Sequence, residues 1–250
     1  MGTQIVTSFC LLMAVCLVTA TASAVTPYTL SDLGTLGGSW TDARGINDAG
    51  QIVGAALTPG GGHSIALLWQ EGVVYDLNDL LVGNPGWELH GGNAINEAGQ
   101  IAGCGLNPDG DSHALLLNPL AGPGISYTLT DLGTLGGSWI DARGINDAGQ
   151  IVGAALTPGG GHSIALLWQE GVVYDLNDFL VGSPGWELHG GNAINEAGQI
   201  AGCGLNPDGD SHALLLNPIP EPCTLALTAL GTVGLLVRRR RLWMECPFTQ

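Results

Sequence analysis

Two copies of one short stretch could hold a cation. Asn-Pro-Asp-Gly-Asp-Ser-His places side-chain oxygens at alternate positions. Such alternation opens a Ca²⁺ loop, but an EF-type loop also needs glycine at its sixth position and a late glutamate. Here Gly110 stands fourth and no glutamate follows in register, so a Pro-Asp-Gly hairpin turn is the better interpretation. The candidate Ca²⁺ ligands are Asn107, Asp109 and Asp111, and in the copy Asn206, Asp208 and Asp210.

Tryptophans next to carboxylates form a second candidate site, because an indole can stack on a sugar ring while carboxylates bind its hydroxyls. The phrase Pro-Gly-Trp-Glu-Leu-His occurs twice, and Leu-Gly-Gly-Ser-Trp also occurs twice. The alternative is that these indoles close loops against the sheets. The candidate ligand face comprises Trp40, Trp87, Trp139, Trp186, Glu88 and Glu187, with His90 and His189 beside them.

Histidines recur at His63, His113, His162 and His212, always at the start of an apolar stretch. A zinc site needs ligands that converge, whereas repeat positions are displaced from one another. Candidate catalytic residues likewise occur as repeated copies. They do not form the single set of nucleophile, base and orienting group that a catalytic site needs. We therefore expect neither a bound metal nor catalytic residues, and an enzyme acting on polysaccharide is only a remote alternative.

The charge of the chain excludes one class of partner. The 250 residues include 6 Lys and Arg against 22 Asp and Glu. Only two of the basic residues, Arg44 and Arg143, lie between residues 25 and 219. Nucleic acid needs basic contacts to its phosphates, so it is not an expected partner, while an extracellular polysaccharide is compatible with this surface.

The elements that would carry these residues follow from an internal repeat. Residues 28–119 and 127–218 are offset by 99 positions (127 − 28) and differ only at 31/130, 41/140, 80/179 and 84/183. Each half is itself double, because Ile46 corresponds to Ile95, 49 residues later. Four modules of about 50 residues indicate a solenoid, propeller or array. Their approximate bounds are 34–80, 81–132, 133–179 and 180–218.

Each module predicts short strands separated by glycine turns. In His-Ser-Ile-Ala-Leu-Leu-Trp, residues 63–69, both alternate faces are apolar, which is typical of a strand buried between sheets. We therefore predict an all-β chain whose body, residues 25–218, forms a four-bladed β-propeller-like ring. Residues 28–33 would supply the fourth strand of the last blade and close the ring. An open array, or closure between two chains, is the alternative.

The repeated phrases Asp-Leu-Gly-Thr-Leu-Gly-Gly-Ser, Gly-Ile-Asn-x-Ala-Gly-Gln-Ile-Val-Gly and Gly-Gly-His-Ser-Ile-Ala-Leu-Leu-Trp resemble the HAF family of extracellular repeat proteins. The resemblance covers residues 28–218. The chain departs from the family in lacking the phenylalanine of the His-Ala-Phe-like stretch. The resemblance implies a bacterial surface or secreted repeat protein and carries no catalytic residues.

Both ends of the chain predict export. Residues 1–24 combine an apolar stretch with Ala22-Ser23-Ala24 before Val25, the pattern of a secretory signal peptide without its usual basic start. Residues 219–241 resemble the PEP-CTERM sorting signal, which implies processing by an exosortase. The matching positions are Pro220, Glu221, Pro222, an apolar span at 223–237, and Arg238, Arg239, Arg240 and Arg241.

The C-terminal arginines predict orientation as well as sorting. A transmembrane helix over the apolar span would leave the arginines, and residues 242–250, on the cytoplasmic side. A plain membrane anchor or a buried helix is the alternative. The family usually ends soon after the arginines, and this chain continues.

The sequence as a whole predicts a membrane-tethered, then surface or extracellular, structural or adhesive protein. A lectin-like binding module is the alternative. Cys104 and Cys203 belong to the repeat body and would sit on opposite blades, so we expect small buried thiols and no disulfide.

Overall fold

The computed structural model describes residues 28–83 and 86–219. The predicted signal peptide, the sorting motif from Pro220 onward and the C-terminal tail lie outside the described residues. The chain divides into two units, residues 1–32 and 33–250, and the sheets described below belong to the second. No helix within the described residues has the length and apolar character needed to cross a membrane.

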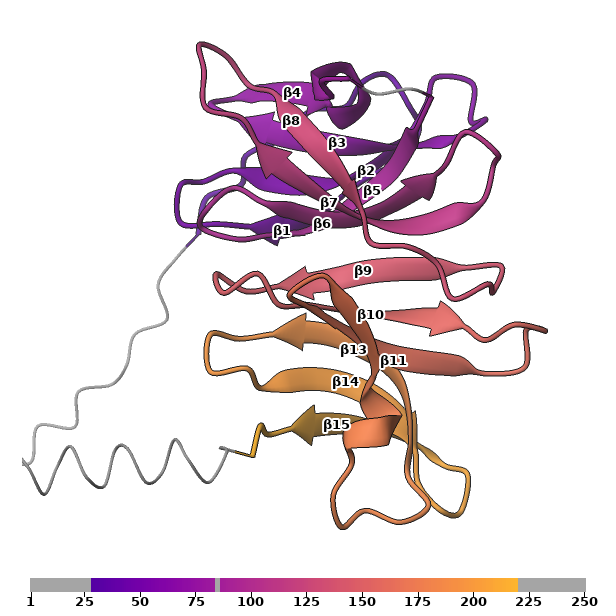
Figure 1. The fold of residues 1–250 in the computed structure, drawn as a ribbon. Helices are drawn as coiled ribbons and strands as arrows, with labels where there is room; N and C mark the ends of the chain where they lie inside the picture. Colours follow the sequence, from indigo (N-terminus) through magenta and orange to yellow (C-terminus); the bar gives the residue numbers. More distant parts are fainter. Residues whose placement is uncertain (1–27, 84–85, 220–250) are drawn as a thin grey trace, which may run out of the picture. The chain divides into compact units, whose positions relative to one another are not determined.

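The described residues form four antiparallel sheets in a propeller-like arrangement, each with its strands in chain order (Figure 1). The first sheet contains β1 (Thr41–Ile46), β2 (Ile52–Leu57), β3 (Ser64–Gln70) and β4 (Val73–Asp76). The second contains β5 (Glu88–Ile95), β6 (Ile101–Leu106), β7 (Ser112–Pro119) and β8 (Tyr127–Asp131). The third contains β9 (Ile140–Ile145), β10 (Ile151–Leu156), β11 (Ser163–Gln169) and β12 (Val172–Asp175). The last contains β13 (Glu187–Ile194), β14 (Ile200–Leu205) and β15 (Ser211–Leu216).

Two short 3-10 helices, η1 (Leu77–Leu80) and η2 (Leu176–Phe179), follow β4 and β12. Asp76 caps η1 by accepting a hydrogen bond from the Asn78 backbone N–H at 2.9 Å, and Asp175 does the same for η2. For the described residues, the prediction of an all-β fold built from four repeated modules is therefore confirmed.

The turn between the first two strands of each sheet depends on one asparagine. In the first sheet, Asn47 Oδ1 accepts a hydrogen bond from the Gln51 backbone N–H at 3.0 Å, and Asn47 Nδ2 donates to Gln51 Oε1 at 2.8 Å. Gly50 has φ +74°, a left-handed conformation that favours glycine. This arrangement explains why Ile-Asn-x-Ala-Gly-Gln recurs at the same place in all four modules.

The same asparagines also join one sheet to the next. Asn47 Nδ2 donates to the Asn96 carbonyl at 3.1 Å, Asn96 Nδ2 to the Asn146 carbonyl at 3.2 Å, and Asn146 Nδ2 to the Asn195 carbonyl at 3.1 Å. We call these four residues the asparagine ladder. The first three are buried, whereas Asn195, at the open end, is exposed. The ladder places the first strands of all four sheets in the same register and direction.

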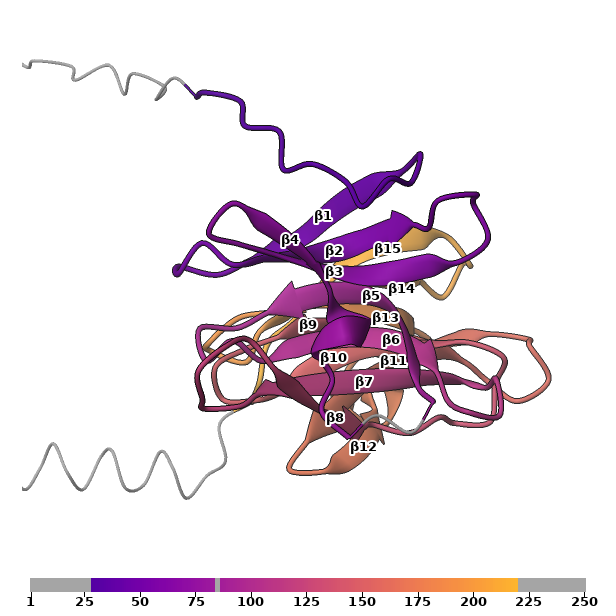
Figure 2. The same cartoon turned by 90° about the horizontal axis from the view of Figure 1, so that it is seen from above.

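Apolar packing holds neighbouring sheets together. β5 packs against β2 and β3, as Figure 2 shows, β9 against β6 and β7, and β13 against β10 and β11. In β3, Ala66, Leu67, Leu68 and Trp69 are all buried. The prediction that this stretch is covered on both faces is thus confirmed.

The strand expected at residues 28–33 is not formed. These residues adopt no strand, and the last sheet has three strands within the described part of the chain. Tyr28 and Leu30 are 90% and 97% exposed. Extensive contacts join the first sheet to the second, the second to the third and the third to the last, and none in the described residues joins the last to the first. The local pattern of Tyr-Thr-Leu-Ser-Asp favours a strand, but a strand also needs a partner edge.

Candidate functional site

The four candidate tryptophans lie at one end of the sheets. Trp40 directly precedes β1, and its carbonyl accepts a hydrogen bond from the Leu57 backbone N–H at 3.0 Å, where β2 ends. Trp139 has the same relation to Leu156, at 2.9 Å. Trp87 and Trp186 directly precede β5 and β13. Because the first strands run in one direction, all four indoles share the end that also carries the Pro-Gly hairpin turns, opposite to the asparagine ladder.

Each of these indoles contacts a side chain of its own sheet. The Arg44 guanidinium lies 5.9 Å from the centre of the Trp40 ring, and Arg143 lies 5.2 Å from that of Trp139, within cation–π range. No ring contact between two tryptophans occurs among the described residues. Trp40 is exposed and the other three are half-buried.

Trp87 and Trp186 meet histidine rings edge to face. The ring centres of Trp87 and His113 are 5.3 Å apart, and those of Trp186 and His212 are 5.5 Å apart. These contacts favour the interpretation in which the indoles close loops against the sheets. They leave Trp40 as the indole with the most surface available to a ligand.

The candidate carboxylates lie in solvent beside half-buried histidines. Glu88 Oε2 is 3.8 Å from His90 Nε2, and Glu187 Oε2 is 3.7 Å from His189 Nε2. Both histidine Nε2 atoms are buried without a hydrogen-bond partner among the described residues. Among the described residues, neither pair is hydrogen-bonded to a nucleophile.

The candidate Ca²⁺ ligands are placed in two hairpin turns. Asn107 Oδ1 accepts hydrogen bonds from the backbone N–H groups of Asp109 at 3.0 Å and Asp111 at 2.8 Å, and Asn206 does the same for Asp208 and Asp210. An oxygen that already accepts two such bonds is not directed at a cation. Within the described residues, no three His, Cys, Asp or Glu side chains gather as a metal would require.

Sequence patterns did not reveal the polar contacts between the second and third sheets. Asn93 Nδ2 donates to Asp141 Oδ1 and, at 2.8 Å, to the Ala142 carbonyl. Burial, and then the neighbouring Asp141 carboxylate, raises the pKa of the Cys104 thiol to about 12. Asn93 is 48 residues from Asp141 and 49 from Ala142, close to the length of one module. This spacing is the sequence signal that could have indicated a contact between neighbouring modules.

The two body cysteines are free thiols. Cys104 lies at the interface between the second and third sheets, against Asp141. Cys203, its equivalent, occupies β14 in the last sheet. The expectation that they do not form a disulfide is therefore consistent with the structure.

The burial of Asp141 should make the stability of the fold depend on pH. Burial raises the pKa of Asp141 above its ordinary value of 3.8, despite the opposing effect of Arg143. The folded chain thus holds this proton more tightly than the unfolded chain, so the stability contributed at this site falls as the pH rises from about 4 through the raised pKa. We expect Asp141→Asn to flatten this fall, measured as the free energy of unfolding in urea between pH 4 and 7.

Asp42 supplies the matched control, because it occupies the equivalent position in β1. Its side chain is 51% exposed, against 18% for Asp141. Asp42→Asn removes the same charge without relieving burial. Equal flattening in both variants would contradict the assignment to Asp141.

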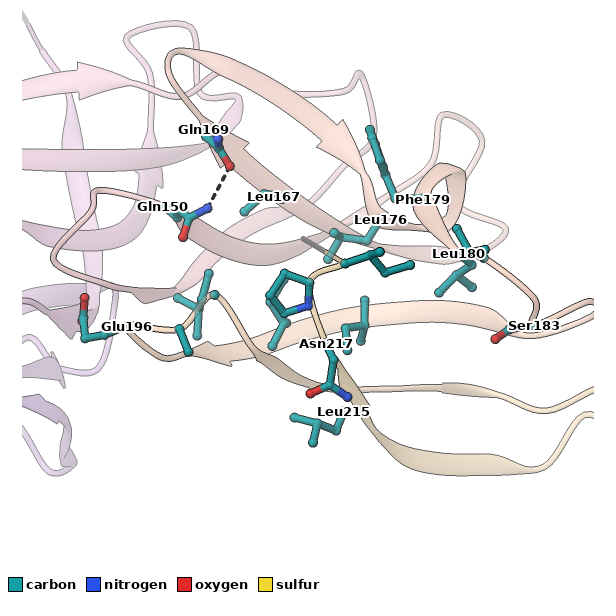
Figure 3. Close-up of a pocket in the computed structure, with 18 residues that line it drawn as sticks. Gln150, Leu167, Gln169, Leu176, Phe179, Leu180, Ser183, Glu196, Leu215 and Asn217 are labelled. Carbon is teal, nitrogen blue, oxygen red and sulfur yellow. Dashed lines mark hydrogen bonds between the residues drawn. The ribbon is translucent and has the colours of Figure 1, made fainter. Parts of the chain in front are cut away.

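The structure also contains a groove that sequence analysis did not predict. It has a volume of about 820 Å³ and lies between β11 and η2 on one side and β14 and β15 on the other. Figure 3 shows Phe179 at the end of η2 with Leu180 directly after it, and Leu215 in β15 with Asn217 just beyond the strand. In the first half of the chain, the equivalent space is filled by β8, where Tyr127 is fully buried among apolar side chains.

Comparison with known proteins adds no family to this description. A scan against protein-family models finds no match, and a search of curated proteins finds none either. The resemblance to HAF repeats and to the PEP-CTERM signal therefore rests on the quoted motifs alone.

Proposed function

We propose that this chain is an exported, non-enzymatic repeat protein with a structural or adhesive role at a bacterial surface or in an extracellular matrix. Its PEP-CTERM-like segment would tether it to the membrane and present it to an exosortase. The proposal combines the acidic repeat body with the two terminal segments, which are known from sequence only.

One observation supports a structural role above the others: the repeated polar side chains form contacts between sheets. Asn47, Asn96 and Asn146 each donate to the next sheet. Arg44 Nη1 donates to Asn93 Oδ1 at 2.6 Å, and Arg143 Nη1 to Asn192 Oδ1 at 2.7 Å. The candidate indoles, by contrast, contact side chains of their own sheets. The contacts of the repeated asparagines and arginines thus favour a role in cohesion between modules.

Intact-protein mass spectrometry tests export and sorting. The protein would be recovered from the surface or medium of an exosortase-bearing host. We expect a mature chain that starts at Val25 and ends near Pro220-Glu221-Pro222. The control replaces these three residues by alanine, and we expect it to retain the arginine tail. A wild-type protein that keeps Arg238 to Arg241 would contradict sorting by this signal.

A lectin-like role is the second candidate, and the exposure of Trp40 favours it. In that case a glycan array would show binding that is lost in the double variant Trp40→Ala and Trp139→Ala. Because loss of binding also follows from unfolding, the circular dichroism of the double variant must match that of the wild type. If the wild type bound none of the glycans on the array, the lectin-like role would be excluded.

A further inference from the structure

The last sheet lacks a strand that its sequence twin possesses. In the second sheet, β8 pairs with β7, with Leu117 opposite Leu129 and Pro119 opposite Tyr127. In the last sheet, β15 pairs with β14 alone among the described strands, and the groove of about 820 Å³ occupies the position equivalent to β8. The groove therefore has an unpaired strand edge along it, the feature to which an extended segment adds as a further strand.

The chain itself contains a segment with the required sequence. Tyr28-Thr29-Leu30-Ser31-Asp32 matches Tyr127 to Asp131, the residues of β8, at every position except Ser31. In the structure these five residues form no strand, and Tyr28 and Leu30 are almost fully exposed. The sequences of the donor and of the acceptor of one strand pairing thus both occur in each molecule.

Two polar groups also lack partners that their equivalents have. His113 Nδ1 lies 2.7 Å from Asp131 Oδ1 of β8, whereas His212 has no carboxylate partner among the described residues. Trp168 Nε1 donates to the Leu132 carbonyl, directly after β8, at 3.1 Å. The equivalent Trp69 Nε1 is buried without a hydrogen-bond partner in the described part of the chain. A docked 28–32 segment would bring the Asp32 carboxylate to His212, as Asp131 meets His113. It would also hold the Leu33 carbonyl where Trp69 Nε1 can donate to it, as Trp168 donates to Leu132.

The first and last sheets each expose apolar side chains whose equivalents are buried between the second and third sheets. Ile145 of β9 is 8% exposed against the second sheet, whereas Ile46 of β1 is 66% exposed. On the opposite side of that interface, Ala102 and Ala114 are fully buried against β9, while their equivalents Ala201 and Ala213 are exposed. The first and last sheets therefore carry the two halves of the interface that already joins the second sheet to the third.

We propose that a second copy of this chain docks onto the last sheet, inserting its Tyr28–Asp32 segment beside β15 and packing its β1 against β14 and β15. The established interface fixes the expected contacts. Asn192 would meet Asp42 of the second copy as Asn93 meets Asp141, and Asn195 would extend the asparagine ladder to Asn47 of the second copy. The described residues show no extensive contact between the first and last sheets of one molecule, which favours a second copy over self-closure.

The two surfaces differ from each other, so the association is head-to-tail. Such an interface produces a ring if the rotation between copies closes and an open chain of molecules if it does not. The inference concerns the folded body and does not depend on the proposed export and sorting.

Complementation between two defective variants tests the proposal. Leu215→Asp places a charge in the acceptor groove, and the double variant Tyr28→Ala with Leu30→Ala removes the donor side chains. All three side chains are exposed in the single molecule, so both variants should fold. The full chain is studied in detergent micelles, and its oligomeric state is followed by sedimentation velocity over a hundredfold range of concentration.

We expect the wild type to form dimers or larger species, and each variant alone to be monomeric. Loss of a buried aromatic anchor weakens an interface by roughly 30-fold or more. A one-to-one mixture should yield heterodimers and nothing larger, because one intact donor and one intact acceptor remain. Leu120→Ala, in an exposed loop, is the control and should assemble like the wild type.

Three outcomes would overturn the proposal. A wild type that stays monomeric at all concentrations would show that no second copy docks. Variants that assemble as well as the wild type would place the contact elsewhere, for example in the C-terminal segment. Monomeric variants whose mixture gives no heterodimer would show that the segment and the groove do not complement each other between molecules.

Discussion

Replacing Gly153 by alanine is expected to lower the free energy of unfolding by about 3 kcal/mol or more, the upper range for overpacking a core. A Cβ at this buried position of β10 would overlap the backbone carbonyl of Asp141 and lie 3.0 Å from Cζ3 of Trp168. The carbonyl belongs to the neighbouring strand β9 and cannot move without breaking the pairing of β9 with β10. Thermal unfolding followed by circular dichroism should show a midpoint lower by roughly 10 °C.

Gly161 provides the matched control for this substitution. It lies in the following hairpin turn, has no positive φ, and an added Cβ would meet nothing within 4 Å. Gly161→Ala should leave the midpoint unchanged or raise it slightly, because alanine restricts the unfolded chain. If Gly153→Ala proved as harmless as Gly161→Ala, the close approach of β9 to β10 described here would be incorrect.

The second large effect is expected at the asparagine ladder. Asn146→Ala removes hydrogen bonds to Gln150 Oε1 at 2.8 Å and to the Asn195 carbonyl at 3.1 Å, and leaves the Gln150 backbone N–H without its acceptor. Because Asn146 is fully buried, water cannot replace these partners. Leaving buried polar groups unsatisfied costs about 1–3 kcal/mol each. We expect a loss of about 3 kcal/mol in urea unfolding.

Asn195→Ala tests the same chemistry at an exposed position. Asn195 makes equivalent bonds within its own turn, to Gln199 Oε1 and from the Gln199 backbone N–H, both at 2.9 Å. It donates to no further sheet among the described residues, and water can satisfy the groups it leaves. We expect a loss below about 1 kcal/mol at low protein concentration. Similar losses in both variants would mean that the contacts between sheets contribute little.

The repeat explains why much of the fold could be predicted from the sequence. Two halves that differ at four positions share the same local preferences, and the pattern of residues 63–69 required cover on both faces. Each Asp-Ala-Gly or Glu-Ala-Gly phrase marked a turn, and the positive φ of Gly50 and Gly99 confirms two of them. Local patterns of this kind determine strands and turns, because they depend on neighbours within a few residues.

Placement between modules could not be predicted in the same way. Repetition shows that two units are alike but does not give the rotation between them, so residues 28–33 were assigned to a closing strand that is not formed. The bonds of Arg44 to Asn93 and of Asn93 to Asp141 depend on that rotation. The sequence predicts that the tryptophans share one end of the sheets. It does not predict which side chains they contact, because the contacts with Arg44, Arg143, His113 and His212 depend on side-chain packing.

The two kinds of interface between sheets constrain how the gene can change in length. Arg-to-Asn contacts join the first sheet to the second and the third to the last, whereas Asn-to-Asp contacts join the second to the third. Unequal recombination that adds or removes one 99-residue half (127 − 28) keeps this alternation, and every junction it creates is of a kind already present. Loss of one inner module, the second or the third, would instead bring together two sheets of the same kind. The chain should therefore tolerate length variation in steps of two modules and resist the loss of a single inner module.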